Sequence, residues 1–232
     1  MLTLPIREVL VATPRARIVR LDLDAQPFAY LAGQALLVAP HGLPPRRAYS
    51  IACSPEEAAE QHTLELLVGI EASGQSGPPL TLDPGALVDI DGPIGRFTFP
   101  TDPQERRFLF VAGGTGVSPL RAMLHHALAI PHDAIGFLYS ARTPDEFAYE
   151  TELKALAAAG RIELCQTITR EAAADSWLGR RGRISRDDLA PLVHTTETLC
   201  FICGPQPLVQ DMLAALGELG VARERIKIEE WG

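Results

Sequence analysis

Four consecutive residues with little or no side chain, Gly113, Gly114, Thr115 and Gly116, separate an apolar run from a helical pattern in the stretch FLFVAGGTGVSPLRAML. Because glycine has no Cβ, the backbone there can turn sharply and a ligand can approach it closely. The helix that follows presents unpaired N–H groups and the positive end of its dipole, and Pro119 suits its first turn. The stretch therefore predicts a phosphate or pyrophosphate site. A plain tight turn stays the alternative, since Pro119 replaces the third glycine of G-x-G-x-x-G.

Cysteine is the other residue type that could carry chemistry. Cys200 and Cys203 form a C-x-x-C pair, which is half of a metal site or a redox pair. A metal site needs two more ligands at suitable spacing, and strand alternation directs these two thiols to opposite faces. We therefore predict no metal site and expect Cys53 and Cys165 to be packing residues. The four cysteines match neither a disulfide framework nor the spacing of a plant-type iron–sulfur cluster.

Composition limits the function classes. The 232 residues include 21 Lys and Arg against 29 Asp and Glu, a net charge of −8. This balance argues against general binding to nucleic acid or anionic membranes, which requires a basic surface. No run approaches the roughly 20 apolar residues of a membrane span, and the N-terminus lacks the features of a secretory signal. We therefore expect a cytoplasmic protein without a membrane span.

The first hundred residues read as short strands separated by Pro, Gly and Asp at intervals of about ten residues, which favours an antiparallel barrel or sandwich. The run IVRLDLD alternates apolar and polar residues, as a strand with one solvated face does. The polar stretch TDPQERR, residues 101–107, marks the expected boundary, giving domains 1–102 and 103–232. The expected strands are REVLVAT, ARIVRLDL, GQALLVAP, RAYSIACS, TLELLVGI and ALVDIDGP.

Beyond residue 107 strands and helices alternate, which predicts a parallel sheet with right-handed crossovers. We expect one helix over residues 143–160, with Thr143 as N-cap, Pro144 at the first position and Glu146 closing a capping box. A shorter helix is expected after Ser185, which has Asp188 at the same spacing. The remaining strands are RFLFVAGG, AIGFLYSA, RIELCQTIT, TLCFICGP and RIKIEEW, and the remaining helices are SPLRAMLHHALAI and PQPLVQDMLAALGELG.

Five motifs in order resemble those of the ferredoxin–NADP reductase superfamily. They are R-x-Y-S at Arg47-Ala48-Tyr49-Ser50, DGPIGRF with Gly92-Pro93 and Gly95, GGTGVSP, Cys203-Gly204-Pro205 at a strand-to-helix turn, and the ending IKIEEW. The resemblance covers nearly the whole chain. It implies a flavin-binding antiparallel β-barrel followed by a parallel α/β domain that binds a nicotinamide nucleotide, here without an iron–sulfur domain.

The resemblance also implies roles for single residues. Arg47 would pair with the flavin pyrophosphate, for which a guanidinium is well shaped. Tyr49 would pack on the isoalloxazine ring and Ser50 would lie near flavin N5. Cys203 would contact the nicotinamide, and Glu229 would help to deliver protons. Ser50, Cys203 and Glu229 are thus the candidate catalytic residues, whereas each motif residue taken alone could be an ordinary surface, core or turn residue.

Further cofactor contacts are expected at the C-terminus and in the first domain. Trp231 would cover the flavin or pack at the seam between the two domains, with a frayed end as the alternative. The family's second flavin motif, G-x-x-S/T-x-x-L, is altered: Gly74 is in register, Gly77 occupies the Ser/Thr position and Ser76 stands one residue early. Backbone N–H groups of this stretch can still form an anion-binding nest. FAD is the expected flavin, with FMN the less common choice in the family.

These features predict a flavin-dependent oxidoreductase that takes a hydride from NADH or NADPH and passes electrons to a separate, unidentified acceptor. Arg142, after the strand AIGFLYSA, could meet a 2′-phosphate, stack on adenine or only solvate a helix start. The stretch YSARTPDEFAY resembles NADH-using members somewhat more than NADPH-using ones. Two alternatives stay open: an electron-transfer subunit of a multicomponent oxygenase or dehydrogenase, and a non-catalytic flavin- or nucleotide-binding sensor.

Overall fold

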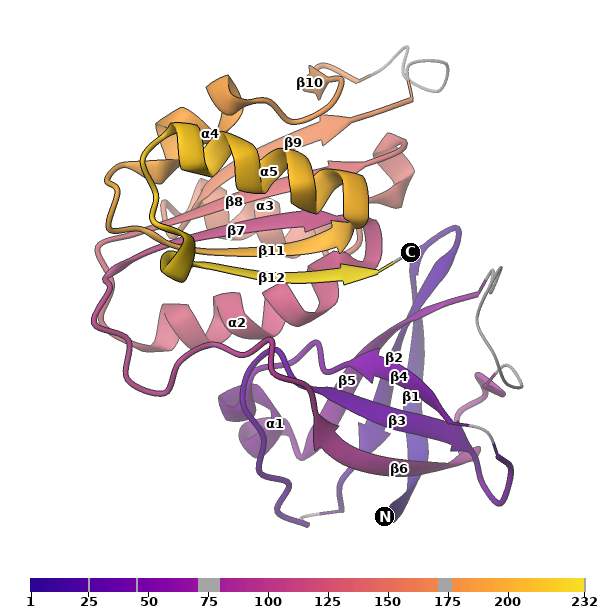
Figure 1. The fold of residues 1–232 in the computed structure, drawn as a ribbon. Coiled ribbons are helices and arrows are strands. Elements are labelled where there is room, and N and C mark those ends of the chain that lie inside the picture. The colour runs from indigo at the N-terminus through magenta and orange to yellow at the C-terminus, as the bar shows by residue number, and fades with distance from the viewer. Residues whose placement is uncertain (25, 45, 71–79, 171–176, 232) are drawn as a thin grey trace. The chain divides into compact units, whose positions relative to one another are not determined.

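A computed structural model describes residues 1–24, 26–44, 46–70, 80–170 and 177–231 of the chain (Figure 1). The chain divides into two compact units. The N-terminal unit is Met1–Thr101 together with Arg121–His126, and the C-terminal unit is Asp102–Leu120 with Ala127–Gly232. The six residues from 121 to 126 were not expected in the first unit. The assignment of 1–102 to flavin and 103–232 to nucleotide stays a prediction.

The N-terminal unit contains a six-stranded antiparallel sheet in the order β4-β3-β6-β1-β2-β5. An isolated bridge between Ile51, just after β4, and Leu66 of β5 joins the two edge strands, so the sheet closes on itself. This confirms the expected antiparallel barrel. The strands are β1 (Leu2–Thr13), β2 (Ala16–Asp22), β3 (Ala35–Pro40), β4 (Arg47–Ser50), β5 (Thr63–Gly69) and β6 (Leu87–Ile94).

Alternation along the strands builds the barrel core. In and after β2, Val19, Leu21 and Leu23 are buried while Arg20 and Asp22 are half-buried, as the pattern IVRLDLD predicts. The core is close-packed and mostly aliphatic, with Tyr49 as the contribution of β4. Its largest fully buried aliphatic members are Leu4, Ile6, Leu21, Leu36, Ile51 and Leu64.

A short helix, α1 (Pro55–Gln61), lies between β4 and β5 and was not predicted. Its N-terminus forms a complete capping box. The Glu57 N–H donates to the Ser54 hydroxyl at 3.2 Å, and the Ser54 N–H donates to the Glu57 carboxylate at 2.8 Å. The signal was present in the sequence as Ser54-x-x-Glu57 with Pro55 at the first position, which is a standard helix start.

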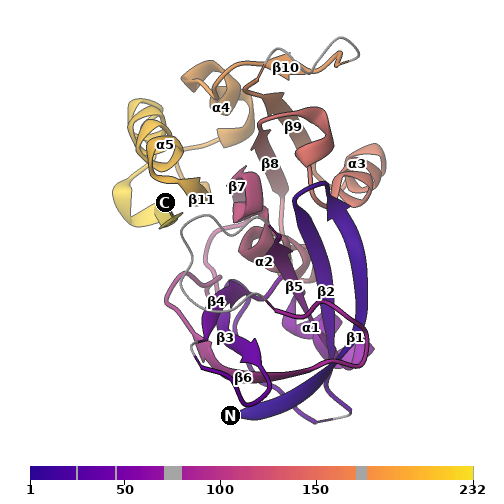
Figure 2. The same cartoon turned by 90° about the vertical axis from the view of Figure 1, so that its right-hand side faces the viewer.

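The C-terminal unit is a six-stranded sheet, parallel throughout, in the order β10-β9-β8-β7-β11-β12. Helices α4 and α5 pack on one face of it, and α2 and α3 lie on the other (Figures 1 and 2). This confirms the expected parallel α/β domain. The strands are β7 (Arg107–Gly113), β8 (Ala134–Ala141), β9 (Glu163–Ile168), β10 (Arg180–Arg181), β11 (Leu199–Pro205) and β12 (Ile226–Trp231), and the helices are α2 (Val117–Ala129), α3 (Glu150–Ala158), α4 (Arg186–Val193) and α5 (Gln206–Glu218).

The capping box of α4 is confirmed, because the Ser185 N–H donates to the Asp188 carboxylate at 2.7 Å. The two-residue strand β10 was not predicted. Throughout the described ranges, no helix combines the length and the apolar character that crossing a membrane demands.

The single helix expected over 143–160 is wrong. Pro144–Glu146 forms one 3₁₀ turn, the chain is then extended at Phe147, and α3 begins only at Glu150. Thr143 makes no capping bond to the backbone. Tertiary packing causes the break: the Phe147 ring is buried edge-on against Tyr139 at 5.0 Å and stacks on Trp177 at 5.5 Å. Burying this ring outweighs the local helix signal.

Asp89 of β6 bonds to β1 and to the turn that follows β3. Its carboxylate accepts hydrogen bonds from the Thr3 hydroxyl at 2.7 Å and the Gly42 N–H at 2.9 Å, and it pairs with His41 Nδ1 at 2.9 Å. These contacts, led by the Gly42 N–H, hold the pKa of Asp89 well below its usual range. A carboxyl group with a depressed native pKa stabilises the fold when it is ionised.

We expect Asp89→Asn to lower the urea midpoint of unfolding at pH 7, because an amide cannot accept all of these bonds. The native pKa lies below the unfolded value of about 3.9, so the contribution is present above pH 4 and is lost as the pH falls further. The difference between parent and variant should therefore shrink below pH 4. Asp91→Asn, which alters a more exposed pair with Met1 and Arg46, is the control and should change little. A constant difference from pH 7 to pH 3 would contradict the assignment.

Candidate coenzyme and flavin sites

The order of the parallel sheet creates a switch point between β7 and β11. The chain winds from β7 outward through β8 and β9, then returns to place β11 on the other side of β7. Ligands of open α/β sheets bind at the carboxyl ends of the strands at such a point. Two turns lie there: the β7–α2 turn with Gly113, Gly114 and Gly116, and the β11–α5 turn with Gly204. The sequence motifs are thus brought together by the strand order.

The two turns approach each other too closely for side chains. A Cβ on Gly116 would lie 2.3 Å from the Cys203 carbonyl oxygen, and a Cβ on Gly204 would lie 2.7 Å from a Leu208 methyl and 3.2 Å from the Gly113 Cα. A Cβ on Gly113 would meet the same Leu208 side chain at 2.5 Å. Backbone packing therefore requires glycine at Gly116, whether or not a ligand is bound, whereas a Cβ at Gly113 or Gly204 would first displace the Leu208 side chain.

Gly114 and Thr115 form the part of the turn that reaches solvent. Gly114 has φ = +54° and is half-buried, and Thr115 is exposed. Gly114–Gly116 form one 3₁₀ turn, and Gly116 precedes α2 without giving it a side-chain cap. Tyr139 holds the turn in place. Its hydroxyl donates to the Gly114 carbonyl at 3.0 Å and accepts from the Ala148 N–H at 3.3 Å. An uncapped helix start with exposed backbone beside it suits an anion. Pro119 lies in the first turn of α2, as expected.

Sequence analysis missed Tyr139. The signal available was an aromatic residue near the carboxyl end of the neighbouring strand AIGFLYSA. That pattern is equally typical of a core residue, and only the strand register brings its hydroxyl under the turn.

Cys203 and Glu229 face each other across β11 and β12. They are register partners, and the Cys203 thiol lies 3.8 Å from the Glu229 carboxylate. Burial raises the pKa of the Cys203 thiol, and the nearby Glu229 charge raises it further. Burial also raises the pKa of Glu229, although the thiol contact partly opposes this. Cys203 is thus a thiol that loses its proton less readily than usual, and Glu229 is a carboxyl group whose proton is held more tightly than usual.

Cys200 lies with the apolar cluster under α4 and α5, while Cys203 is paired with Glu229. The two thiols of the C-x-x-C pair therefore have different surroundings, in agreement with the alternation argument. Gly204 is buried, and Pro205 lies next to Trp231 in the backbone register of β12.

The R-x-Y-S motif forms β4, which lies where the barrel closes. Arg47 and Tyr49 share one side of the strand, and the Arg47 guanidinium hydrogen-bonds the Tyr49 hydroxyl. Burial raises the pKa of Tyr49, and the guanidinium partly offsets this. Ala48 is exposed, and Ser50 is a half-buried residue at the end of β4 opposite Ala35. The strand thus carries a cation beside a phenol ring at the closing seam of the barrel.

The structure leaves some expected residues apart from these clusters. Arg142 is exposed and directly follows β8. The altered motif with Gly74, Ser76 and Gly77 lies outside the described residues, so its expected role stays a prediction.

Comparison with known proteins agrees with this geometry. Residues 110–213 match the oxidoreductase NAD-binding domain family. Ferredoxin–NADP reductase B of Sorangium cellulosum is 36% identical over 220 residues, which are 90% of this chain and 88% of that protein. NADH-cytochrome b5 reductase 2 of Scheffersomyces stipitis is 26% identical and aligns with 82% of this chain and 68% of its own. The flavohem-like FAD/NAD binding domain of nitric oxide dioxygenase from Vibrio cholerae has the same fold, with a TM-score of 0.82 at 24% identity over 99% of this chain and 98% of that one.

The chain belongs to the ferredoxin–NADP reductase superfamily. Membership confirms the resemblance drawn from the five motifs. It also confirms the expected enzyme class, a NAD(P)H-dependent flavoprotein reductase with FAD and NAD(P)H as its cofactors. This reductase's own residues suit such groups chemically: an uncapped helix start behind a glycine turn fits a pyrophosphate, and a guanidinium beside a tyrosine ring fits a flavin nucleotide.

We expect Gly116→Ala to lower the free energy of unfolding of this reductase by about 2–3 kcal/mol, since the new Cβ would meet a backbone carbonyl that cannot rotate away. Chemical denaturation of the purified protein measures this. Gly217→Ala is the matched control, because a Cβ at that position in α5 meets nothing within 4 Å. It should stabilise the protein by about 0.5 kcal/mol. Equal stability of the two variants would show that the turns do not need glycine.

Proposed function

We propose that this reductase takes a hydride from NADPH onto bound FAD and passes the electrons singly to a separate redox protein. The observation that carries the proposal is the meeting of the two glycine turns at the switch point, beside the Cys203–Glu229 pair. The flavin supplies the chemistry, since it accepts a hydride and releases its two electrons one at a time. The chain supplies binding, orientation and proton handling.

In this proposal the coenzyme pyrophosphate binds at Gly114, Thr115 and the start of α2. The support is local: the helix start has no side-chain cap, and Tyr139 fixes the Gly114 carbonyl so that the turn keeps one conformation. A preformed turn binds an anion without a cost for ordering the loop. The two turns are kept in contact by Gly113, Gly116, Gly204 and Pro205. Pro119 starts the helix α2.

The flavin site in this proposal is β4. Arg47 binds the flavin pyrophosphate, Tyr49 packs against the ring system and Ser50 donates its hydroxyl to N5, with Ala48 leaving the backbone accessible. The pairing of Arg47 with Tyr49 supports it, because it places a cation and a flat ring on the same side of one strand. Gly74, Ser76, Gly77 and Trp231 complete the expected set.

Cys203 and Glu229 take separate roles. Cys203 is a neutral, buried contact for the nicotinamide ring, since burial keeps its thiol protonated at neutral pH. Glu229 is the proton donor and acceptor, because its raised pKa lets it hold a proton closer to neutral pH than an ordinary glutamate. We infer that both act beside the coenzyme at the carboxyl end of β11 and β12.

NADPH is proposed over NADH because of the charge at the end of β8. An acidic residue near this position selects the 2′-hydroxyl of NADH, whereas an arginine suits the 2′-phosphate. Here the residue is Arg142, and the Arg170 N–H donates to the Arg142 carbonyl at 2.9 Å, so a second arginine stands beside it at the end of β9. This closeness of two arginine residues along the backbone is given more weight than the sequence similarity of YSARTPDEFAY to NADH-using proteins.

A one-electron protein acceptor is proposed because two relatives are named for such partners, ferredoxin and cytochrome b5. Within that scheme the chain is either a free-standing reductase or the electron-transfer subunit of a multicomponent oxygenase or dehydrogenase. A non-catalytic sensor would bind both cofactors and leave the flavin oxidised.

The deciding experiment is a visible spectrum of the purified protein under anaerobic conditions. We expect a yellow protein whose flavin band is bleached by NADPH without any other protein, after which candidate acceptors restore the band. Arg47→Ala should lower flavin retention by tenfold or more, in line with a charge-assisted contact of about 1.5–3 kcal/mol, and leave the far-ultraviolet circular dichroism unchanged. A protein that takes up no flavin, or one that NADPH and NADH both leave oxidised, would refute the proposed reaction.

Coenzyme choice has its own test. We expect Arg142→Ala to raise the KM for NADPH about tenfold through loss of a charge-assisted contact, while the KM for NADH changes less than about twofold. Arg161→Ala is the control, because this exposed arginine precedes β9 and so lies at the amino ends of the strands, opposite the end where Arg142 lies. If both coenzymes lose affinity equally, Arg142 does not read the 2′-phosphate.

A further inference from the structure

Trp177 is an aromatic residue of the C-terminal unit that the sequence motifs did not single out. Its indole ring stacks on the Phe147 ring, with 5.5 Å between the ring centroids and 23° between the ring planes. The indole Nε1–H donates to the Arg180 carbonyl at 2.9 Å, and the Arg181 guanidinium donates to the Trp177 carbonyl at 2.9 Å. Gly179 leaves room for the indole, since a Cβ there would lie 2.5 Å from a ring carbon. The indole therefore has one defined place, on the Phe147 ring.

Phe147 joins the indole to Tyr139 in two ways. The Phe147 ring packs edge-on against the Tyr139 ring, with 5.0 Å between the centroids. The N–H of the next residue, Ala148, donates to the Tyr139 hydroxyl at 3.3 Å. Phe147 is 4% exposed and Tyr139 is fully buried. Burial raises the pKa of Tyr139, so its hydroxyl keeps its proton and can donate it.

The Tyr139 hydroxyl donates its proton to the β7–α2 turn. The acceptor is the Gly114 carbonyl at 3.0 Å, which also accepts from the Val117 N–H. The Gly114 carbonyl and the Thr115 N–H belong to one peptide group. Because a trans peptide group is planar, its N–H points opposite to its carbonyl. A carbonyl held toward Tyr139 therefore directs the Thr115 N–H away from Tyr139.

This peptide group needs an external contact to keep its orientation. Gly114 has φ = +54°, and a glycine resists rotation of the neighbouring peptide less than any other residue. The segment that supplies the contact has an unfavourable local geometry, because the non-glycine residue Tyr149 has φ = +60° at the N-cap of α3. Such geometry persists where the surrounding structure fixes a position, and here the fixed position is that of Phe147 and Ala148.

We propose that Trp177 and Phe147 are positioning residues for coenzyme binding, which hold Tyr139 so that the Gly114–Thr115 peptide presents its N–H to the pyrophosphate. This rests on the proposed function. Trp177 itself makes no contact with the coenzyme in this proposal. Loss of the stacked ring leaves the turn to be ordered when the coenzyme binds, and that ordering cost lowers the affinity.

A double-mutant cycle on the holoprotein tests the proposal, with the dissociation constant of NADP⁺ as the readout. Trp177→Leu removes the stacked ring and Tyr139→Phe removes the hydroxyl, and we expect each to raise the constant about fivefold. Because both act along one path, the double variant should also show an increase of about fivefold. Two independent contacts would instead give roughly 25-fold, the product of the single effects. That product would show that the indole contacts the coenzyme directly, and it would overturn the proposal.

Two further variants at this stack separate positioning from stability. Trp177→Phe keeps a ring that can stack on Phe147, so its dissociation constant should stay within about twofold of the parental value. Gly179→Ala displaces the indole without removing it and should weaken binding as Trp177→Leu does. The matched control is Leu178→Ala, because the Leu178 side chain is fully exposed and its loss should change nothing. If Trp177→Leu lowers the free energy of unfolding but keeps the parental dissociation constant, Trp177 serves stability alone and the proposal is wrong.

Hydrogen exchange gives a readout that needs no coenzyme. In Trp177→Leu and in Tyr139→Phe, amide exchange in the turn from Gly113 to Val117 should become about threefold or more faster, while Leu178→Ala leaves it unchanged. Parental exchange of this turn in a folded Trp177→Leu protein would refute the link from the indole to the turn. If the parent binds neither NADP⁺ nor NAD⁺, the proposed function is wrong, and the exchange of the turn still decides whether Trp177 positions it.

Discussion

The β7–α2 turn and the β11–α5 turn lie against each other with no space for side chains between them. The rest of the C-terminal unit depends on this constraint. With the backbones of Gly116 and Cys203 in contact, neither turn can carry a side chain toward the other. That contact fixes where α2 begins relative to β11, the strand that carries the Cys203–Glu229 pair. Gly116 is thus needed for packing before any ligand is considered. A glycine-rich turn can be indispensable to a coenzyme site without each glycine touching the coenzyme.

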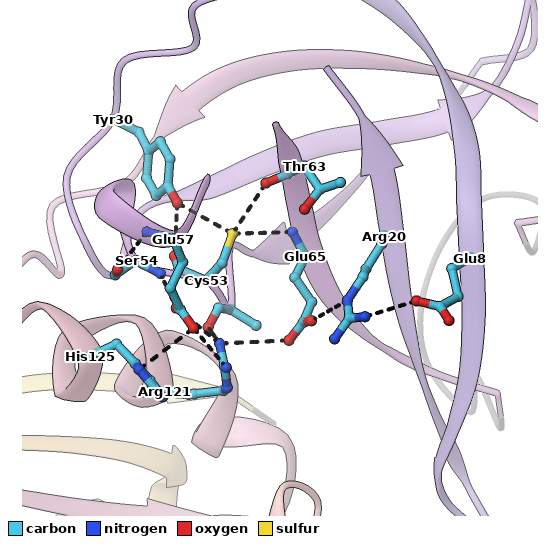
Figure 3. Close-up of polar contacts among 11 residues, drawn as sticks. Glu8, Arg20, Tyr30, Cys53, Ser54, Glu57, Thr63, Glu65, Arg121 and His125 are labelled. Atoms are coloured by element: carbon cyan, nitrogen blue, oxygen red, sulfur yellow. Dashed lines mark hydrogen bonds and ion pairs between the residues drawn. The ribbon is translucent and has the colours of Figure 1, made fainter. Parts of the chain in front are cut away.

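The barrel meets a related constraint at its closing seam. β4 is only four residues long, and the bridge from Ile51 to Leu66 closes the sheet just beyond it. Because β4 is short, it makes few ladder bonds. The chain that leaves it is held by side chains instead: the Tyr30 hydroxyl donates to the Cys53 carbonyl, and the Arg121 guanidinium donates to the Ala52 carbonyl. Glu57 serves both as the capping residue of α1 and as the partner of Arg121. The Glu57 carboxylate therefore caps α1 and also binds Arg121, which holds the chain that leaves β4 (Figure 3).

Burial sets the chemistry of the remaining groups. The Cys203 thiol stays protonated because it is buried beside a carboxylate, while the Glu229 carboxyl holds its proton more tightly for the same reason of desolvation. In the barrel the opposite occurs at Asp89, where donated hydrogen bonds keep the carboxylate ionised. The surroundings of two acidic residues thus move their pKa values in opposite directions: desolvation raises that of Glu229, and donated hydrogen bonds lower that of Asp89.

The sequence alone determined the two fold classes, the six barrel strands and the main elements of the parallel sheet, because alternation and helix periodicity record which face of each element is buried. It also determined the family, since five ordered motifs are specific together. Tertiary structure decided what no local pattern records. Burial of Phe147 against Tyr139 and Trp177 divided an expected helix. Strand order brought Tyr139 under Gly114 and Glu229 beside Cys203. Arg121, an ordinary helix residue in the sequence, is buried against Glu57, because a contact between residues 64 positions apart depends on the folded chain.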